Sequence, residues 1–407
     1  MFSEKVKYIG VDDTDLDLFE SQYHVPQGMC YNSYVLMADS ITVMDTVDRR
    51  KTDEWMTKLE AALNGAKPTY LVVQHVEPDH SGSVGAFLQK YPDTQVVATR
   101  PAHKMLQQFG VEVAHEVVIK NGETMDIGGM TLHFLTAPMV HWPEVVMTYV
   151  PEELTLFSAD AFGKFGVYGA DPDNWTDEAR RYYFNICGKY GQQVSAALRK
   201  VTALSVDAIA PLHGPVLDGD QVYEAVRLYL LWSSYQPETE GVLVAYASIH
   251  GHTREAALKF AEVLKERGAL QVKTIDLTRD DLSEALSQAF RFSRLALCCS
   301  SYDGTMFTPM ADFLHRLGLK HYQSRRVGLM QNGSWAPMAA KAMKLTLREM
   351  KNIIFCNYTV TITGQMQPSN LEDMNDLADA LLSNEEVVHL NQRPRTPNNA
   401  DEDDSEA

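Results

Sequence analysis

The sequence predicts an α/β protein with two domains, an αββα sandwich followed by a doubly wound parallel sheet. Over residues 1–237, apolar strand-type runs and helical patterns come in blocks, which favours a layered sandwich. Over residues 241–385, five strand-type runs alternate with helical patterns, as a doubly wound sheet requires. A polar segment with Pro237 and Gly241 separates the two patterns, so we place the domain boundary there.

Composition and charge exclude several classes of protein. A chain of 407 residues exceeds one ordinary core, and a net charge of −18 argues against a nucleic-acid partner. No apolar run approaches the roughly 20 residues that a membrane helix needs, and the start of the chain lacks the pattern of a secretory signal. The five cysteines form no C-x-x-C pair, which indicates a reducing compartment and no disulfide framework. We therefore expect a cytoplasmic protein without a rubredoxin-like module.

The expected elements of the first domain follow from period-2 and period-3.6 patterns of apolar residues. Strands are expected at 6–11, 34–39, 41–45, 69–74, 95–99, 117–119, 130–136, 145–150, 154–159 and 206–212. Helices are expected at 52–64, from 81 onward, at 102–109 and within 178–199.

The second domain is expected to contain five strand–helix units. Its strands are predicted at 242–247, 272–277, 295–299, 327–331 and 353–361, and its helices at 254–267, 282–290, 309–317, 336–350 and 371–382. Beyond residue 384 the periodicity is lost, and the acidic segment 386–407 is expected to be a disordered tail.

The first candidate site is the run His75-Val76-Glu77-Pro78-Asp79-His80, in which four of six side chains can bind metals. It follows a strand-type run, which is where α/β proteins usually place their chemistry. Carboxylates beside histidines make a harder site than the ligands of structural zinc, so the composition favours non-haem iron.

Three later residues complete a candidate metal-binding set. His141, Asp160 and His213 each follow an apolar run. One ion accepts at most six ligands and would have no open position, whereas two ions about 3.5–4 Å apart would keep open positions. We therefore expect a two-metal site. Its six ligands are expected to be His75, Glu77, Asp79, His141, Asp160 and His213.

Three loops of the second domain follow strands and offer hydroxyls, backbone amides and aromatic rings. The first resembles the phosphate loop S/T-x-x-G-x-T of flavodoxins, in which the amino terminus of a helix attracts the phosphate, so we expect the loops to bind FMN. The expected FMN-binding residues are Ser248, Ile249, His250, Gly251, His252 and Thr253; Ser300, Ser301, Tyr302, Asp303 and Gly304; and Asn332, Gly333, Ser334, Trp335 and Ala336.

The motif H-x-E-x-D-H resembles the H-x-H-x-D-H signature of the metallo-β-lactamase fold, with Glu77 in place of its second histidine. A metallo-β-lactamase-like domain followed by a flavodoxin-like domain resembles the flavodiiron proteins (A-type flavoproteins) over about residues 3–385. This resemblance implies that Asp160 bridges the two irons. It also makes Tyr23 and His24 candidates for lining the site. The role of His80 is open: Pro78 stiffens the loop, so the His80 ring either binds a metal or turns away and hydrogen-bonds outside the ligand shell.

The resemblance implies an enzyme that reduces dioxygen to water, nitric oxide to nitrous oxide, or both. FMN would relay electrons to a non-haem diiron centre. The donor would be external: a rubredoxin-like protein, a flavin reductase or reduced deazaflavin. The family also implies a head-to-tail homodimer, or a dimer of such dimers. We expect dioxygen to be favoured, because three carboxylates stabilise oxidised irons.

The sequence departs from the usual family pattern at two places, and two alternative functions are considered. His250 stands where many family members have Trp or Tyr, and Cys298-Cys299-Ser300 replaces a more usual Gly-Ser-Pro. One alternative is a zinc-dependent hydrolase of the metallo-β-lactamase fold fused to a flavodoxin module. The other is a flavoprotein electron carrier with a degenerate metal domain. Glu77 argues against the first alternative, and the complete ligand set argues against the second.

Overall fold

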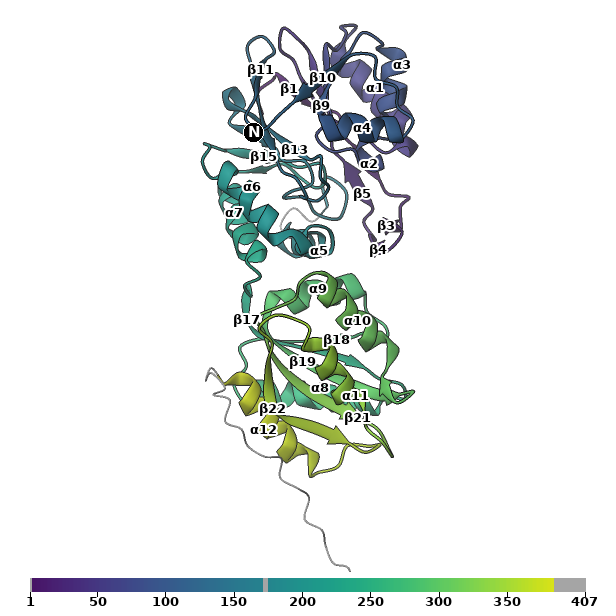
Figure 1. The fold of residues 1–407 in the computed structure, drawn as a ribbon, viewed down its shortest axis with the longest axis vertical. Coiled ribbons are helices and arrows are strands. Elements are labelled where there is room, and N and C mark those ends of the chain that lie inside the picture. The colour runs from purple at the N-terminus through teal and green to yellow at the C-terminus, as the bar shows by residue number, and fades with distance from the viewer. Residues whose placement is uncertain (1, 171–174, 384–407) are drawn as a thin grey trace, which may run out of the picture.

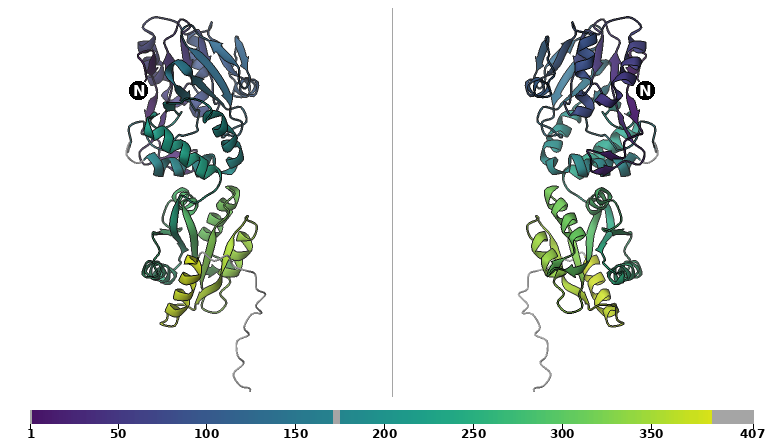
Figure 2. Two further views of the ribbon diagram at one scale, coloured as in Figure 1. Left: turned by 90° about the vertical axis from the view of Figure 1, so that its left-hand side faces the viewer. Right: turned by 90° about the vertical axis from the view of Figure 1, so that its right-hand side faces the viewer.

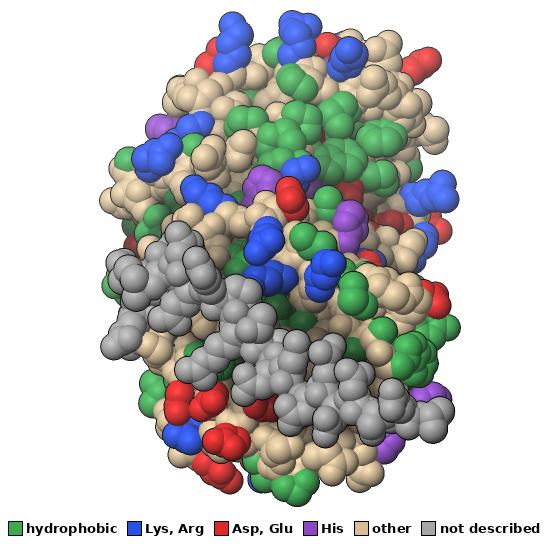
Figure 3. All heavy atoms as spheres, turned by 60° about the horizontal axis from the view of Figure 1, so that its bottom comes forward, with side chains coloured by type: hydrophobic (Ala, Val, Ile, Leu, Met, Phe, Trp, Pro, Cys, Tyr) green, Lys and Arg blue, Asp and Glu red, His purple; other side chains and the backbone are tan. Residues whose placement is uncertain are grey.

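The computed structural model describes residues 2–170 and 175–383 (Figure 1). The chain forms two bodies stacked along the long axis of the molecule (Figures 1 and 2). The expected acidic tail, 386–407, lies outside the described residues. No helix in the described part of the chain is both long enough and apolar enough to cross a membrane. On the face in Figure 3, Lys and Arg side chains lie in small separate groups among apolar and acidic ones.

The first domain is built on two six-stranded sheets. The first has the order β1 (Val6–Tyr8), β6 (Tyr34–Leu36), β7 (Thr42–Met44), β8 (Tyr70–Val72), β9 (Gln95–Thr99), β10 (Glu116–Ile119). The second has the order β11 (Thr124–Asp126), β12 (Thr131–Thr136), β13 (Val146–Val150), β14 (Thr155–Phe157), β15 (Ala208–Ala210), β16 (Leu217–Asp218). Two short pairs, β2 (Val11–Asp13) with β5 (Met29–Tyr31) and β3 (Leu18–Phe19) with β4 (Tyr23–His24), extend from the sheets.

Helices cover the outer faces of these sheets, which completes the expected αββα sandwich (Figure 1). On the first sheet lie α1 (Thr52–Leu63), α3 (Val84–Lys90) and α4 (Arg100–Gln108); on the second lie α6 (Gly191–Val201) and α7 (Asp220–Ser233). Apolar side chains on α1, such as Trp55 and Leu59, are fully buried, as the period of the pattern predicts.

Several element boundaries differ from the expectation. The strand expected at 6–11 is two strands, β1 and β2, which pair with different partners, β6 and β5. Gly10 lies between them, and a Cβ there would lie 2.7 Å from the carbonyl oxygen of Tyr31. The helix expected within 178–199 is α5 (Trp175–Ile186) followed by α6. At the start of α6, Gly191 packs so closely that a Cβ would lie 2.4 Å from the carbonyl oxygen of Ser233. A short helix, α2 (Pro78–Ser81), begins inside the candidate metal motif, with Pro78 at a position that proline favours.

The second domain has one parallel sheet with the order β18-β17-β19-β21-β22. This is the flavodoxin-like order 2-1-3-4-5 of a doubly wound sheet, as expected. The strands are β17 (Thr239–Ala247), β18 (Val272–Asp276), β19 (Phe292–Tyr302), β21 (Arg326–Asn332) and β22 (Ile354–Ile362), and the short β20 (Thr305–Met306) pairs with β19. Its helices are α8 (His252–Glu266), α9 (Leu282–Arg291), α10 (Thr308–Leu319), α11 (Ala339–Leu347) and α12 (Asn370–Leu382).

The two domains pack directly on each other. Helices α5 and α9 are neighbours, and the ring of Phe184 stacks on that of Phe290 with centroids 4.1 Å apart. Arg181 of α5 donates to the Ser283 hydroxyl of α9 at 2.9 Å. A continuous apolar core therefore runs from the sandwich into one face of the second sheet, while α8 and α12 enclose a separate core on the other face.

Candidate functional site

Four loops bring the candidate metal ligands to one edge of the sandwich. His75, Glu77 and Asp79 follow β8, and Asp79 lies within α2. The other three follow β12, β14 and β15, in the order His141, Asp160 and His213. The structure thus gathers all six expected residues, and it divides them between two adjoining groups.

The first group contains His75, Glu77, His141 and Asp160. The His141 Nε2 atom lies 2.9 Å from Glu77 Oε2 and 3.1 Å from Asp160 Oδ2. The His75 Nε2 atom lies 3.3 Å and 3.5 Å from the same two oxygens. A single ring N–H is shared poorly between two acceptors, whereas ligands at about 2.0–2.2 Å from one ion come this close to each other. The four atoms are arranged as a metal would require.

The second group contains Asp79, His80 and His213. The His80 Nε2 atom lies 3.1 Å from Asp160 Oδ1, and His213 Nε2 lies 3.3 Å from Asp79 Oδ2. Among the described residues, both oxygens of Asp79, Oδ1 of Asp160 and Nε2 of both histidines are buried without a hydrogen-bond partner. Buried polar atoms seldom lack a partner, so this group also fits a metal ion.

The sequence left open whether His80 binds a metal, and the structure brings its ring into the second group. The position follows from its backbone: the carbonyl oxygen of His80 accepts hydrogen bonds from the hydroxyl and the amide of Thr46, at 2.6 Å and 3.1 Å. These contacts hold α2 against the loop after β7 (Thr42–Met44), and no sequence pattern reveals them.

Asp160 lies between the groups, with Oδ2 toward His75 and His141 and Oδ1 toward His80. The neighbouring backbone is tightly turned: Ala159 has a φ of +52°. Such conformations are costly for residues other than glycine, and they cluster at functional sites. This placement suits a carboxylate shared by two ions.

The electrostatics of the site call for cations. Burial alone would raise the pKa of Glu77, but hydrogen bonds from His141 and His75 outweigh it and lower that pKa to about 2. Burial alone would lower the pKa of His141, but its bonds to Asp160 and Glu77 raise it to about 9. The buried carboxylates thus draw positive charge onto the histidines. A metal cation meets the same demand.

Tyr23 and His24 lie outside both groups. The hydroxyl of Tyr23 donates to the carbonyl oxygen of Asn185 at 3.2 Å, and the side chain of His24 is exposed. The rings that pack against His213 are instead those of Phe19 and Tyr182, at 5.4 Å and 5.6 Å between centroids. Their apolar character gave no sign of this role in the sequence.

The three expected flavin loops meet at the carboxyl edge of the second sheet and line a cavity of about 560 Å³. Most of the expected residues line it; Ser248 and Gly251 line an adjoining cavity of about 430 Å³ instead. The hydroxyls of Thr253 and Ser300 lie 2.8 Å apart and tie the first loop to the second. Trp335 is 92% exposed and Tyr302 is 49% exposed at the rim, where a flat ring could lie against them.

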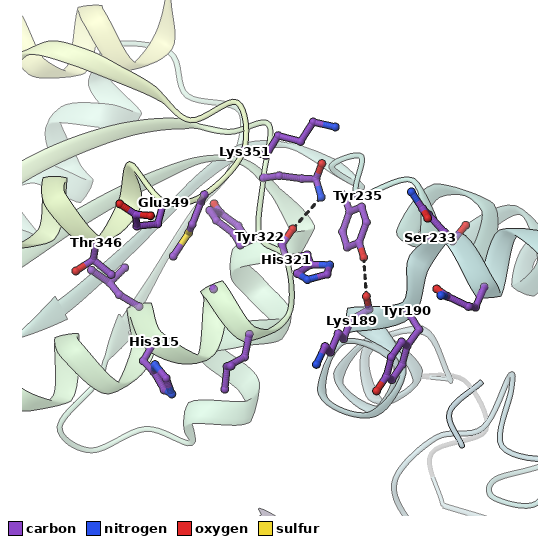
Figure 4. A pocket seen from close by; sticks show the side chains of 17 residues that line it. Lys189, Tyr190, Ser233, Tyr235, His315, His321, Tyr322, Thr346, Glu349 and Lys351 are labelled. Atoms are coloured by element: carbon purple, nitrogen blue, oxygen red, sulfur yellow. Dashed lines mark hydrogen bonds between the residues drawn. The ribbon is translucent and has the colours of Figure 1, made fainter. Parts of the chain in front are cut away.

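A further cavity of about 900 Å³ lies between the domains and contains none of the expected site residues (Figure 4). Lys189, His321 and Lys351 line it, from segments of both domains.

The sequence is similar to a known family and to several known proteins. Residues 29–214 match the family described as ODP family beta lactamase. The anaerobic nitric oxide reductase flavorubredoxin of Aliivibrio fischeri is 29% identical over 347 residues, covering 81% of this chain and 68% of its own. That of Escherichia coli O1:K1 is 27% identical over 359 residues, covering 84% and 74%.

Solved structures show the same fold over the whole described chain. The rubredoxin oxygen:oxidoreductase of Desulfovibrio gigas has a TM-score of 0.87 at 22% identity, covering 93% of this chain and 96% of its own. The flavodiiron protein of Giardia intestinalis has a TM-score of 0.85 at 24% identity, covering 93% and 94%. A beta-lactamase-like domain joined to a flavodoxin-like domain is the fold that this chain shares with the flavodiiron proteins. In sequence the chain is similar to the nitric oxide reductase flavorubredoxins, which are oxidoreductases by name.

Proposed function

We propose that this protein reduces dioxygen to water, nitric oxide to nitrous oxide, or both, with electrons passing from an external donor through FMN to a diiron centre. The observation that carries the proposal is the pair of buried ligand groups that share Asp160. The curated relatives are nitric oxide reductases by name, and one structural neighbour is an oxygen oxidoreductase. The proposal therefore includes both dioxygen reduction and nitric oxide reduction.

In this proposal each group holds one iron. His75, Glu77 and His141 would hold the first and Asp79 and His213 the second, while Asp160, whose two oxygens face both groups, would contribute to each. His80 adds a ligand to the second iron, because its ring faces the same space. When bound, FMN and iron would supply the electron transfer that reduction of a diatomic gas requires. The oxygen ligands favour iron over zinc.

The chain's own residues prepare this chemistry. The carboxylates neutralise the charge of the irons and favour their oxidised form, while buried rings such as Phe19 and Tyr182 limit the entry of water. Dioxygen is the favoured substrate in this proposal, because the three carboxylates Glu77, Asp79 and Asp160 stabilise oxidised irons. Nitric oxide also fits the centre, since two molecules need only two electrons.

The substrate is tested by reducing the protein chemically and supplying each gas separately at matched donor flux. We expect dioxygen turnover at least comparable with nitric oxide turnover, ending in water without free peroxide. Turnover of nitric oxide alone would reverse the preference, and turnover of neither gas would refute the proposal.

FMN is proposed to bind with its phosphate at residues 248–253, where the helix α8 begins. Replacing Ser248 and Thr253 together by alanine should weaken FMN binding. Each lost charge-assisted hydrogen bond costs roughly 1.5–3 kcal/mol, about ten- to a hundredfold in affinity. Titration of the apoprotein followed by flavin fluorescence measures the change, with Thr346→Ala on α11 as the control. Unchanged affinity, or FAD as the native flavin, would contradict this placement.

We also propose a cytoplasmic homodimer or a dimer of dimers. The flavin cavity opens at the carboxyl edge of the second sheet, whereas the metal groups lie in the first domain. A head-to-tail pair would place the flavin of one copy beside the metal centre of the other. Light scattering of the active protein tests this arrangement, and a fully active monomer would refute it.

A further inference from the structure

Glu144 is a buried carboxylate that contacts the metal motif from outside. It follows His141 by three residues, in the loop between β12 and β13, and it is 1% exposed. Its Oε1 atom lies 2.7 Å from Nδ1 of His75 and accepts a hydrogen bond from the backbone amide of Val76 at 3.1 Å. The carbonyl oxygen of Glu144 also accepts a hydrogen bond from the hydroxyl of Thr99 at 2.9 Å. Hydrogen bonds therefore hold both the side-chain carboxylate and the backbone carbonyl of Glu144 in place.

We propose that Glu144 is a positioning residue for the diiron centre: it holds the His75 ring with its proton on Nδ1 and the Nε2 lone pair facing the first iron. This inference rests on the proposed function, because it requires iron in the first ligand group. A carboxylate accepts but cannot donate, so the proton of the shared bond belongs to His75. Carboxylate partners of this kind fix the tautomer of a metal-binding histidine and raise its basicity.

The two ligand groups differ in this respect. His213 donates from Nδ1 to the neutral carbonyl oxygen of Cys30 at 2.7 Å, whereas His75 donates to a carboxylate. Hydrogen bonds to an ionised acceptor are roughly twice as strong as neutral ones. His75 is therefore the stronger electron donor, and the iron of the first group is stabilised in its oxidised state.

The segment 141–144 provides both a candidate metal ligand and the residues that contact the His75 ring. His141 contributes a ligand to the first group, and the ring of Trp142 meets the His75 ring edge-on at 5.3 Å between centroids. Glu144 then holds the Nδ1 edge of the His75 imidazole. The segment 141–144 thus fixes His75 in both orientation and proton position.

The test compares Glu144→Gln and Glu144→Ala with the wild type, each expressed in iron-replete medium with its flavin bound. The glutamine amide oxygen can still accept from His75, but it has no charge. We expect E144Q to keep about two irons, with a higher reduction potential of the diiron centre and changed Mössbauer parameters for one iron. E144A loses the acceptor, and its iron affinity should fall about 10- to 100-fold.

The control is Glu116→Gln, which removes an exposed carboxylate from β10 of the same domain and should change neither quantity. FMN content, set by the other domain, and circular dichroism report whether each variant is folded. Unchanged iron affinity in folded E144A, or an E144Q centre identical to the wild type in potential and spectrum, would overturn the inference. A wild-type protein without iron would instead refute the proposed function.

Discussion

Replacing Asp160 by alanine is expected to abolish gas reduction and to lower iron from about two atoms per chain to well below one. The reason is geometric: Oδ2 of Asp160 faces the histidines of the first group, and Oδ1 faces His80 of the second. Loss of this side chain removes a ligand from both ions and a negative charge that both need. Iron analysis and gas consumption measure the effect.

Asp207→Ala is the matched control, because it removes an exposed carboxylate that precedes β15 of the same sheet. Both variants should retain FMN, since the flavin cavity belongs to the other domain. A D160A protein that keeps two irons and its turnover would show that the shared carboxylate is not a ligand.

The largest expected effect on stability comes from Arg325, which is 1% exposed at the domain junction. Its guanidinium donates to the carbonyl oxygens of Phe290 and Phe292, each at 2.8 Å, and to that of Tyr235 in the connecting segment, also at 2.8 Å. Arg325→Leu should lower the free energy of unfolding by about 3–5 kcal/mol, because these buried carbonyl groups would lose their partner.

Urea unfolding followed by tryptophan fluorescence measures this loss. Arg348→Leu is the control, since Arg348 is an exposed residue at the end of α11 and its replacement should change stability by no more than about 0.5 kcal/mol. Equal effects of the two replacements would contradict the role of Arg325 at the junction.

The two-domain architecture followed from sequence because local periodicity and strand–helix alternation determine it. The metal residues could be singled out for a related reason: polar side chains just after strands collect at one edge of a sheet. The structure brings His75, Glu77, His141 and Asp160 together in the way that this rule suggests.

Other features depend on contacts between distant parts of the chain. The place of His80 follows from its bonds to Thr46, and Glu144 meets His75 across 69 residues of sequence. A carboxylate three residues after His141 was a signal that could have been used. A short 3-10 turn, Gly188–Tyr190, divides α5 from α6, and the next residue, Gly191, approaches Ser233 too closely for a Cβ; periodicity shows neither feature.

The central claim is that the two ligand groups hold two irons, and elemental analysis of the purified protein tests it most directly. When the protein is expressed in medium supplied with both iron and zinc, the two metals compete for the site. We predict about two iron atoms and one FMN per chain, with little zinc, because the site supplies three carboxylates beside its histidines. Zinc alone in the site would contradict the account and would favour a hydrolase of the beta-lactamase fold.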